Sequence, residues 1–156
     1  MESYNKIIKN SLFKKTMSAI NQKEKNRIFC CHSIEHCLDV ARIAYILTLE
    51  NNLNISKDII YTTALLHDLG RAYSDSEHNK KSAEIAKQIL EECNYPAFET
   101  DLIISAILNH RRNAEYLNDL SDIICRADKL SRQCYDCNAQ SLCYWEEEKR
   151  NESIKY

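Results

Sequence analysis

The sequence contains a single glycine and a single proline among its 156 residues. Strands of a sheet are joined by tight turns, and those turns usually need glycine, asparagine or proline. A chain with one glycine and one proline is therefore predicted to be all-α, and its length suggests one domain. We expect a single helical bundle over residues 1–156, with a core from about 27 to 132 and a cysteine-containing tail from 133 to 156.

Other features are missing as well. No apolar run approaches the roughly 20 residues of a membrane span, and the N-terminal stretch lacks the apolar centre of a signal peptide. The net charge of −2 and the pI of about 6.2 give no basic excess that would attract nucleic acid or an acidic membrane. We therefore expect a cytoplasmic protein that binds neither membranes nor nucleic acids. In a reducing compartment, the eight cysteines are expected to be thiols or metal ligands.

Apolar residues recur with helical spacing along most of the chain and predict six or seven helices. Gly70 is expected to end the third helix with a positive φ, and Ser74 with Glu77 has the spacing of a capping box before the fourth. Thr100 is expected to cap the fifth helix. The predicted helices cover about 3–22, 32–50, 56–69, a segment from 78, 100–110, a segment from 121 past 128, and a short stretch within 145–156.

Histidines and aspartates fall on the apolar faces of these helices. His36 shares a face with Val40, and the same relation holds for His67 with Ala64; further examples are Asp68, His78, His110 and Asp128. One histidine on an apolar face is usually a hydrogen-bonded core residue, but a buried carboxylate costs several kcal/mol unless it is paired. Four of the five histidines follow this pattern. A shared cation accounts for all of them, because it pairs the carboxylates and uses the neutral imidazoles.

The order of these residues resembles the HD-domain superfamily of helical metal-dependent phosphohydrolases. The matching segments are "EHCLDVARIA", "LLHDLGR", "EHNKKSAEIAKQIL", "ISAILNHR" and "CRADKLS". The resemblance implies that one metal ion is bound by His36, His67, Asp68 and Asp128. It further implies a second ion at His78 and His110. Many members have another histidine where this chain has Arg111, so the resemblance does not assign a subclass.

Nitrogen and oxygen ligands of this kind suit two ions of Fe, Mn, Zn or Ni. Two ions about 3.5–4 Å apart can clamp the attacking and leaving oxygens of a phosphoester. Asp68 is expected to bridge them, and a metal-activated water to act as nucleophile. The resemblance implies a phosphoester substrate, and we expect a nucleotide or another small phosphoester. Arg71 and Arg111 are the predicted phosphate contacts, because each follows a proposed ligand closely at a helix end and arginine suits contact with phosphate.

Two other functions remain compatible with the sequence. Some relatives of the HD superfamily hold two irons and use O₂ to cleave a C–H or C–P bond, and the ligand set alone does not exclude such an oxygenase. A non-catalytic, nucleotide-binding regulatory module is the other alternative. Loss of a ligand would favour that module, and no ligand is lost here.

A second cluster of chemistry-bearing residues lies near the C-terminus. The stretch "RQCYDCNAQSLCYW" carries Cys134, Cys137 and Cys143, and the spacing is typical of a structural zinc site that lacks one ligand. The fourth ligand is sought among Cys30, Cys31 and His32; a resemblance to small bacterial HD-domain proteins with "FC.H" and a cysteine-rich C-terminus favours Cys30. We expect this site to be separate from the catalytic one. Free thiols or an iron–sulfur cluster are the alternatives.

Overall fold

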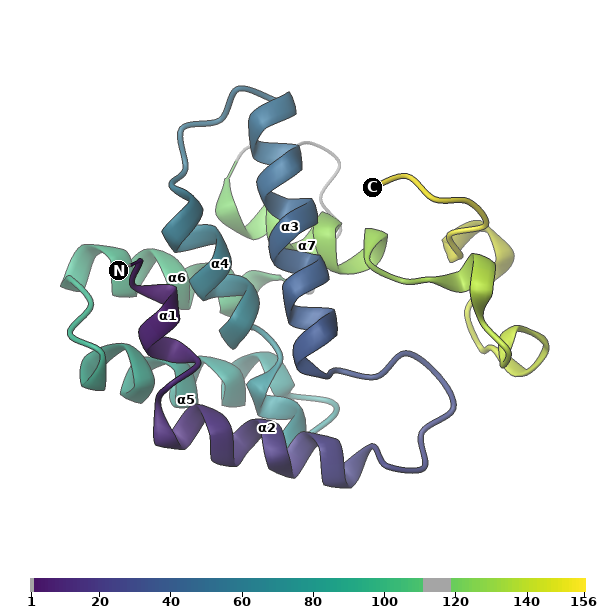
Figure 1. The fold of residues 1–156 in the computed structure, drawn as a ribbon, viewed down its shortest axis with the longest axis horizontal. Helices are drawn as coiled ribbons and strands as arrows, with labels where there is room; N and C mark the ends of the chain where they lie inside the picture. The colour runs from purple at the N-terminus through teal and green to yellow at the C-terminus, as the bar shows by residue number, and fades with distance from the viewer. Residues whose placement is uncertain (1, 111–118) are drawn as a thin grey trace.

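The computed structural model describes residues 2–110 and 119–156. Within those ranges the chain is helical and has no β-strand, so the predicted all-α class is confirmed (Figure 1). None of the described helices has the length and apolar character to cross a membrane. The α-helices are α1 (Tyr4–Ile7), α2 (Ser11–Lys23), α3 (Ile34–Glu50), α4 (Lys57–Leu66), α5 (His78–Glu92), α6 (Ala97–Asn109) and α7 (Leu120–Leu130). Short 3₁₀ helices are η1 (Leu69–Ala72), η2 (Cys134–Asp136), η3 (Gln140–Leu142) and η4 (Glu147–Lys149).

Side-chain caps fix where three of the helices begin. Asn10 accepts a hydrogen bond from the backbone N–H of Phe13 and starts α2, so the single helix predicted over 3–22 is divided in two. Ser56 starts α4 by the same kind of bond, and Asp119 starts α7. A cap of this type stabilises a helix by about 1 kcal/mol.

Two of the predicted boundaries are wrong. Helix α6 begins at Ala97, directly after Pro96, so Thr100 lies inside the helix and does not cap it. Pro96 is the N-cap residue with an extended backbone, and its carbonyl accepts a helical hydrogen bond from the Thr100 N–H at 2.9 Å, so the helix begins one turn earlier than predicted. The predicted C-terminal helix is reduced to the three residues of η4.

Helix α4 lies between two hydrophobic clusters and is buried almost all round. Leu65 and Leu66 pack into a cluster with residues of α2, α5 and α6. Ile60 and Ala64 pack into a second cluster with α3 and α7. Each fully buried leucine or isoleucine contributes roughly 1.5–3 kcal/mol. Because α4 is central, His67 and Asp68, which directly follow it, lie in the interior of the bundle.

Gly70 is needed for a close approach and not for a positive φ, so the prediction that it ends a helix in the left-handed region is wrong. It lies in η1, against the first turns of α5. A Cβ at this position would lie 2.0 Å from the carbonyl oxygen of His78 and 2.6 Å from the backbone nitrogen of Ser82. The N–H of Gly70 donates to Ser82 Oγ at 2.8 Å. Glycine therefore lets the chain after Asp68 lie directly on the helix that begins with His78.

Candidate metal centre

Three of the site histidines are held by backbone carbonyls at helix ends. The distance from Nδ1 to the carbonyl oxygen is 2.7 Å for His67, 2.6 Å for His110 and 3.0 Å for His78. An Nδ1–H that donates to a carbonyl leaves Nε2 as the lone-pair nitrogen. The same arrangement orients histidines that bind metals in other proteins. Each ring therefore presents its Nε2 to the interior of the site.

One group of ligand atoms forms around Asp68 Oδ2. His67 Nε2 lies 3.3 Å from this oxygen, and His36 Nε2 lies 3.7 Å from it. His36 Nε2 is also 3.3 Å from Asp128 Oδ1. Ligand atoms of these four residues all lie within 4.8 Å of one another. The structure thus brings together the four residues that the sequence comparison with the HD superfamily assigned to one ion.

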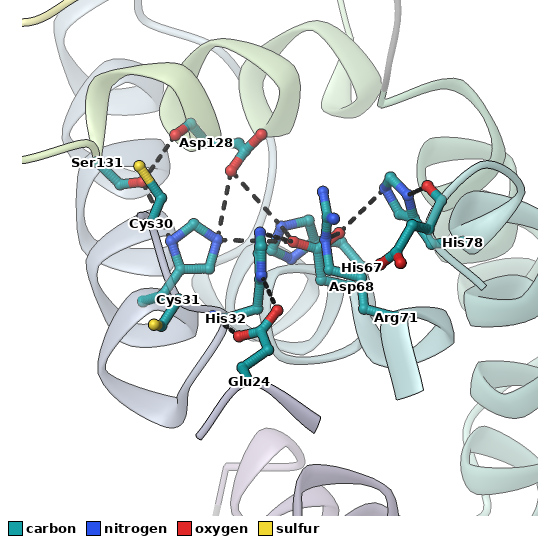
Figure 2. A network of polar contacts seen from close by, with 12 residues as sticks. Glu24, Cys30, Cys31, His32, His67, Asp68, Arg71, His78, Asp128 and Ser131 are labelled. Carbon is teal, nitrogen blue, oxygen red and sulfur yellow. Dashed lines mark hydrogen bonds and ion pairs between the residues drawn. The ribbon is translucent and has the colours of Figure 1, made fainter. Parts of the chain in front are cut away.

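A second group forms around the other oxygen of the same carboxylate. Asp68 Oδ1 lies 3.2 Å from His78 Nε2 and 3.7 Å from His110 Nε2. The two imidazole nitrogens are 3.3 Å apart. Figure 2 shows Asp68 with His78 on one side and Asp128 on the other. One carboxylate therefore faces two sets of nitrogen ligands, which is the arrangement of a bridging ligand.

The buried polar atoms of this cluster fit two divalent cations. His36 Nε2, His67 Nε2 and Asp68 Oδ1 are shielded from solvent and have no hydrogen-bond partner. Leaving such an atom unsatisfied costs about 1–3 kcal/mol. A cation at each group would satisfy these atoms, and the mixture of imidazole and carboxylate suits Fe, Mn, Zn or Ni.

The surroundings push the pKa values of the site residues in opposite directions. Burial opposes the charge of Asp68, but the neighbouring imidazoles outweigh it and hold its pKa well below the ordinary range. Burial likewise opposes the charge of His36, yet Asp128 and Asp68 raise its pKa to about 9. Burial dominates at His78 and lowers its pKa to about 4. In the metal-free protein His78 is therefore neutral at pH 7, whereas His36 must lose a proton before it can bind a cation.

His32 is a site residue that the sequence reasoning assigned elsewhere, as a candidate ligand of the cysteine cluster. Its Nδ1 lies 2.6 Å from Glu24 Oε1, and its backbone N–H donates to Glu24 Oε2 at 2.7 Å. Its Nε2 lies 3.7 Å from Asp68 Oδ2, the same oxygen that His36 Nε2 approaches. The fifth histidine of the chain therefore joins the other four around Asp68. Figure 2 shows His32, His67 and His78 in this arrangement.

Arg71 is the predicted cation that the structure places at the centre. Its Nε lies 3.1 Å from Asp68 Oδ1, and its side chain keeps 20 % of its surface exposed. Arg111 lies outside the described residues.

A cavity of about 390 Å³ opens onto the cluster. Arg71, His32, His36 and Asp128 are among the residues that line it. The four predicted zinc ligands, Cys30, Cys134, Cys137 and Cys143, line the same cavity. No three of these cysteines have their sulfurs within 4.8 Å of one another in the described chain. The cysteine cluster is thus next to the His/Asp cluster, and metal binding at the cysteines stays a prediction.

Comparison with known proteins agrees with this geometry. The family model described as "HD domain" matches residues 33–133, a range that contains all six predicted ligands of the His/Asp cluster. An uncharacterized protein of Clostridium beijerinckii is 38% identical over 159 residues, and the alignment covers the whole of both chains. No solved structure matches this chain.

Proposed function

Because this chain belongs to the HD-domain family, we propose that it is a metal-dependent phosphohydrolase that acts on a nucleotide or another small phosphoester. The observation that carries the proposal is the position of Asp68, whose two carboxylate oxygens each face a separate group of ligand atoms. Members of this family are generally hydrolases. A dinuclear centre of this kind suits attack of water on a phosphoester.

The six residues would divide between two ions. His36, His67 and Asp128 would hold one ion, His78 and His110 the other, and Asp68 would contact both. When bound, the ions would lower the pKa of a water molecule and neutralise charge on the phosphoryl group. The chain itself supplies the orientation, because backbone carbonyls hold the rings of His67, His78 and His110 before any ion arrives.

Arg71 is proposed to bind the phosphate. The Arg71 guanidinium forms an ion pair with Asp68, with Nε 3.1 Å from Oδ1 but without a hydrogen bond, and the side chain lines the cavity. A guanidinium fixed at one edge keeps its terminal N–H groups for a planar, two-oxygen contact with phosphate. The charge of Arg71 therefore stands beside the centre, where the phosphoryl group of the substrate would lie.

The size and lining of the cavity support a substrate larger than inorganic phosphate. Its volume of about 390 Å³ lies in the range of small-molecule sites, roughly 300–1,000 Å³. Arg132 adds a second cation, and Phe29, Tyr144 and Trp145 add aromatic surface. Aromatic side chains stack on nucleobases, so these residues support a nucleotide within the broader class of phosphoesters.

Phosphate release and O₂ uptake test the proposal together. The protein is loaded separately with Mn²⁺, Fe²⁺, Ni²⁺ and Zn²⁺ and offered nucleoside mono-, di- and triphosphates and p-nitrophenyl phosphate. Phosphate release that Asp68→Asn abolishes and Asp101→Asn preserves would support the proposal; Asp101 is an exposed carboxylate on α6. Uptake of O₂ without phosphate release would contradict the phosphohydrolase proposal and favour an oxygenase. Nucleotide binding without either reaction would replace it with the regulatory module.

A further inference from the structure

The C-terminal segment, residues 133–156, has no hydrophobic core of its own. It contains only the three short helices η2, η3 and η4, and Ala139 is its one buried side chain. Large apolar side chains in the segment are exposed, including Leu142 at 67% and Ile154 at 73%. Burial of apolar surface therefore contributes little to holding this segment in place. Small structures with so little core usually depend on a cross-link or a bound metal.

The cysteines of the segment are less exposed than most of its large apolar residues. Cys134, Cys137 and Cys143 are partly buried, and all three line the cavity. Backbone turns follow one another through this stretch: the N–H of Cys137 donates to the carbonyl of Cys134 at 3.3 Å, and that of Gln140 to the carbonyl of Cys137 at 3.2 Å. A turn across C-x₂-C is the local geometry from which zinc sites take two thiolates.

A fourth cysteine reaches the cavity from the loop between α2 and α3. In Figure 1 the segment after α7 leaves the helical bundle on the side where this loop lies. Phe29 packs edge to face on Tyr144, with ring centroids 5.5 Å apart. Phe29 precedes Cys30 and Tyr144 follows Cys143, so this contact brings the two cysteine-bearing segments together. Burial raises the pKa of the Cys30 thiol, and nearby Cys134 and Cys137 raise it further.

We propose that Cys30, Cys134, Cys137 and Cys143 bind one structural ion of the zinc class, and that this ion fastens the C-terminal segment as the outer wall of the catalytic cavity. Four thiolates complete a tetrahedral site and leave no open coordination position. The sulfurs must draw closer than in the described chain, and the lightly packed segment permits that movement. No unfolded chain has such a site, so the binding energy of the ion would become stability of the docked segment.

The second half of the proposal rests on the proposed function. Trp145 and Arg150 line the cavity from the C-terminal segment. The guanidinium of Arg132, which directly precedes the segment and also lines the cavity, stacks on the Trp145 ring at 4.3 Å. The ligands of the His/Asp cluster all lie in the bundle or directly after its helices. Loss of the thiolate ion should therefore weaken substrate binding and leave the reacting centre assembled.

The neighbouring cysteines Cys30 and Cys31 provide a matched pair for the metal test. Cys30→Ser, Cys31→Ser and Cys134→Ser proteins are purified without added metal, and their metal is counted by elemental analysis. The same count is made in the Asp68→Asn background, in which the His/Asp cluster should be empty. We expect about one zinc-like ion in the background protein and in Cys31→Ser, and none in Cys30→Ser or Cys134→Ser. Equal metal in all of them would overturn the site, whatever the protein's activity proves to be.

Two further readouts keep the proposal testable if a serine variant fails to fold. In the native wild type, a thiol reagent should reach four more cysteines after a strong chelator is added, and trypsin should then cut after Arg132. Reaction of these thiols before chelation would overturn the site. Visible charge-transfer absorption with acid-labile sulfide would overturn the zinc class in favour of an iron–sulfur cluster.

Steady-state kinetics tests the role of the segment as a wall of the cavity. Cys134→Ser should raise KM for the phosphoester about tenfold and leave kcat within about twofold, because the segment would stabilise the bound substrate and the transition state equally. An unchanged KM in protein that has lost the ion would contradict the role of the segment as a wall. A loss of kcat with unchanged KM would contradict it as well, because the reacting centre would then depend on the cysteines.

Discussion

Replacing Gly70 by alanine should disrupt the second metal group selectively. The added Cβ would lie 2.0 Å from the His78 carbonyl oxygen, where ordinary contacts are about 3.5 Å. Either η1 or the start of α5 must therefore retreat by roughly 1.5 Å. The two nearest neighbours are backbone atoms and the third is Lys81 Cβ, which no side-chain rotation moves, so a change of rotamer cannot relieve the clash.

This displacement should lower both the stability of the protein and its metal content. Overpacking contributes about 1–3 kcal/mol, and loss of the bond from the Gly70 N–H to Ser82 Oγ adds about 1–3 kcal/mol. We expect the free energy of unfolding to fall by about 4 kcal/mol in all. His78 Nε2, now 3.2 Å from Asp68 Oδ1, would move too far to share an ion with it, because ligand bonds are only about 2.0–2.2 Å long.

Urea denaturation and elemental analysis measure the two effects. Gly70→Ala should lose about one ion per chain and retain the ion held by His36 and Asp128. Ser82→Ala is the control, since it removes the same hydrogen bond without adding volume; it should lose about 1–3 kcal/mol and keep its metal. A Gly70→Ala protein with wild-type stability and metal content would refute the idea that this close approach positions His78.

Three other predictions follow from the site. His110→Ala should lower the metal-to-protein ratio by about one; an unchanged ratio would make His110 a core or substrate residue. Arg71→Lys keeps the charge but loses the planar fork, so KM for a phosphoester should rise about tenfold, and an unchanged KM would remove Arg71 from phosphate binding. In chelator-treated protein, the pKa of His36 is raised from 6.5 to about 9. Its stabilisation is complete below pH 6.5 and disappears as pH rises through 9, so urea denaturation should show a loss of about 2 kcal/mol between pH 7 and 9; a stability that rises over that range would contradict the pairing.

The helices, and the grouping of six candidate site residues, could be predicted because apolar residues recur along the chain with helical spacing. His36 lies on one face with Val40, Ile43 and Leu47, and all three of those apolar residues are buried. The prediction that this face is buried, with an imidazole at one end, does not depend on the exact residue at which the helix begins. The resemblance to the HD superfamily then assigned those residues to ions. The match to the HD-domain family model confirms that the chain belongs to this family.

The features that were missed depend on contacts between distant segments. His32 precedes α3 in a non-helical stretch and has no periodic neighbours, and its place at the centre depends on Glu24 at the end of α2. The sequence predicts Gly70 at a helix end, because its close approach to α5 has no signature in the neighbouring residues. The cysteines were expected to stand apart from the catalytic residues. Their position on the same cavity follows from how the loop between α2 and α3 meets the C-terminal segment.

The most direct test of the proposed dinuclear centre is a metal count on two isosteric variants. Asp68→Asn removes the carboxylate that both groups share, and Asp101→Asn removes an exposed carboxylate on α6. Both proteins are purified without added metal and measured by elemental analysis beside the wild type. The account predicts that Asp101→Asn matches the wild type and that Asp68→Asn contains about two fewer ions per chain. Equal metal content in the two variants would contradict it.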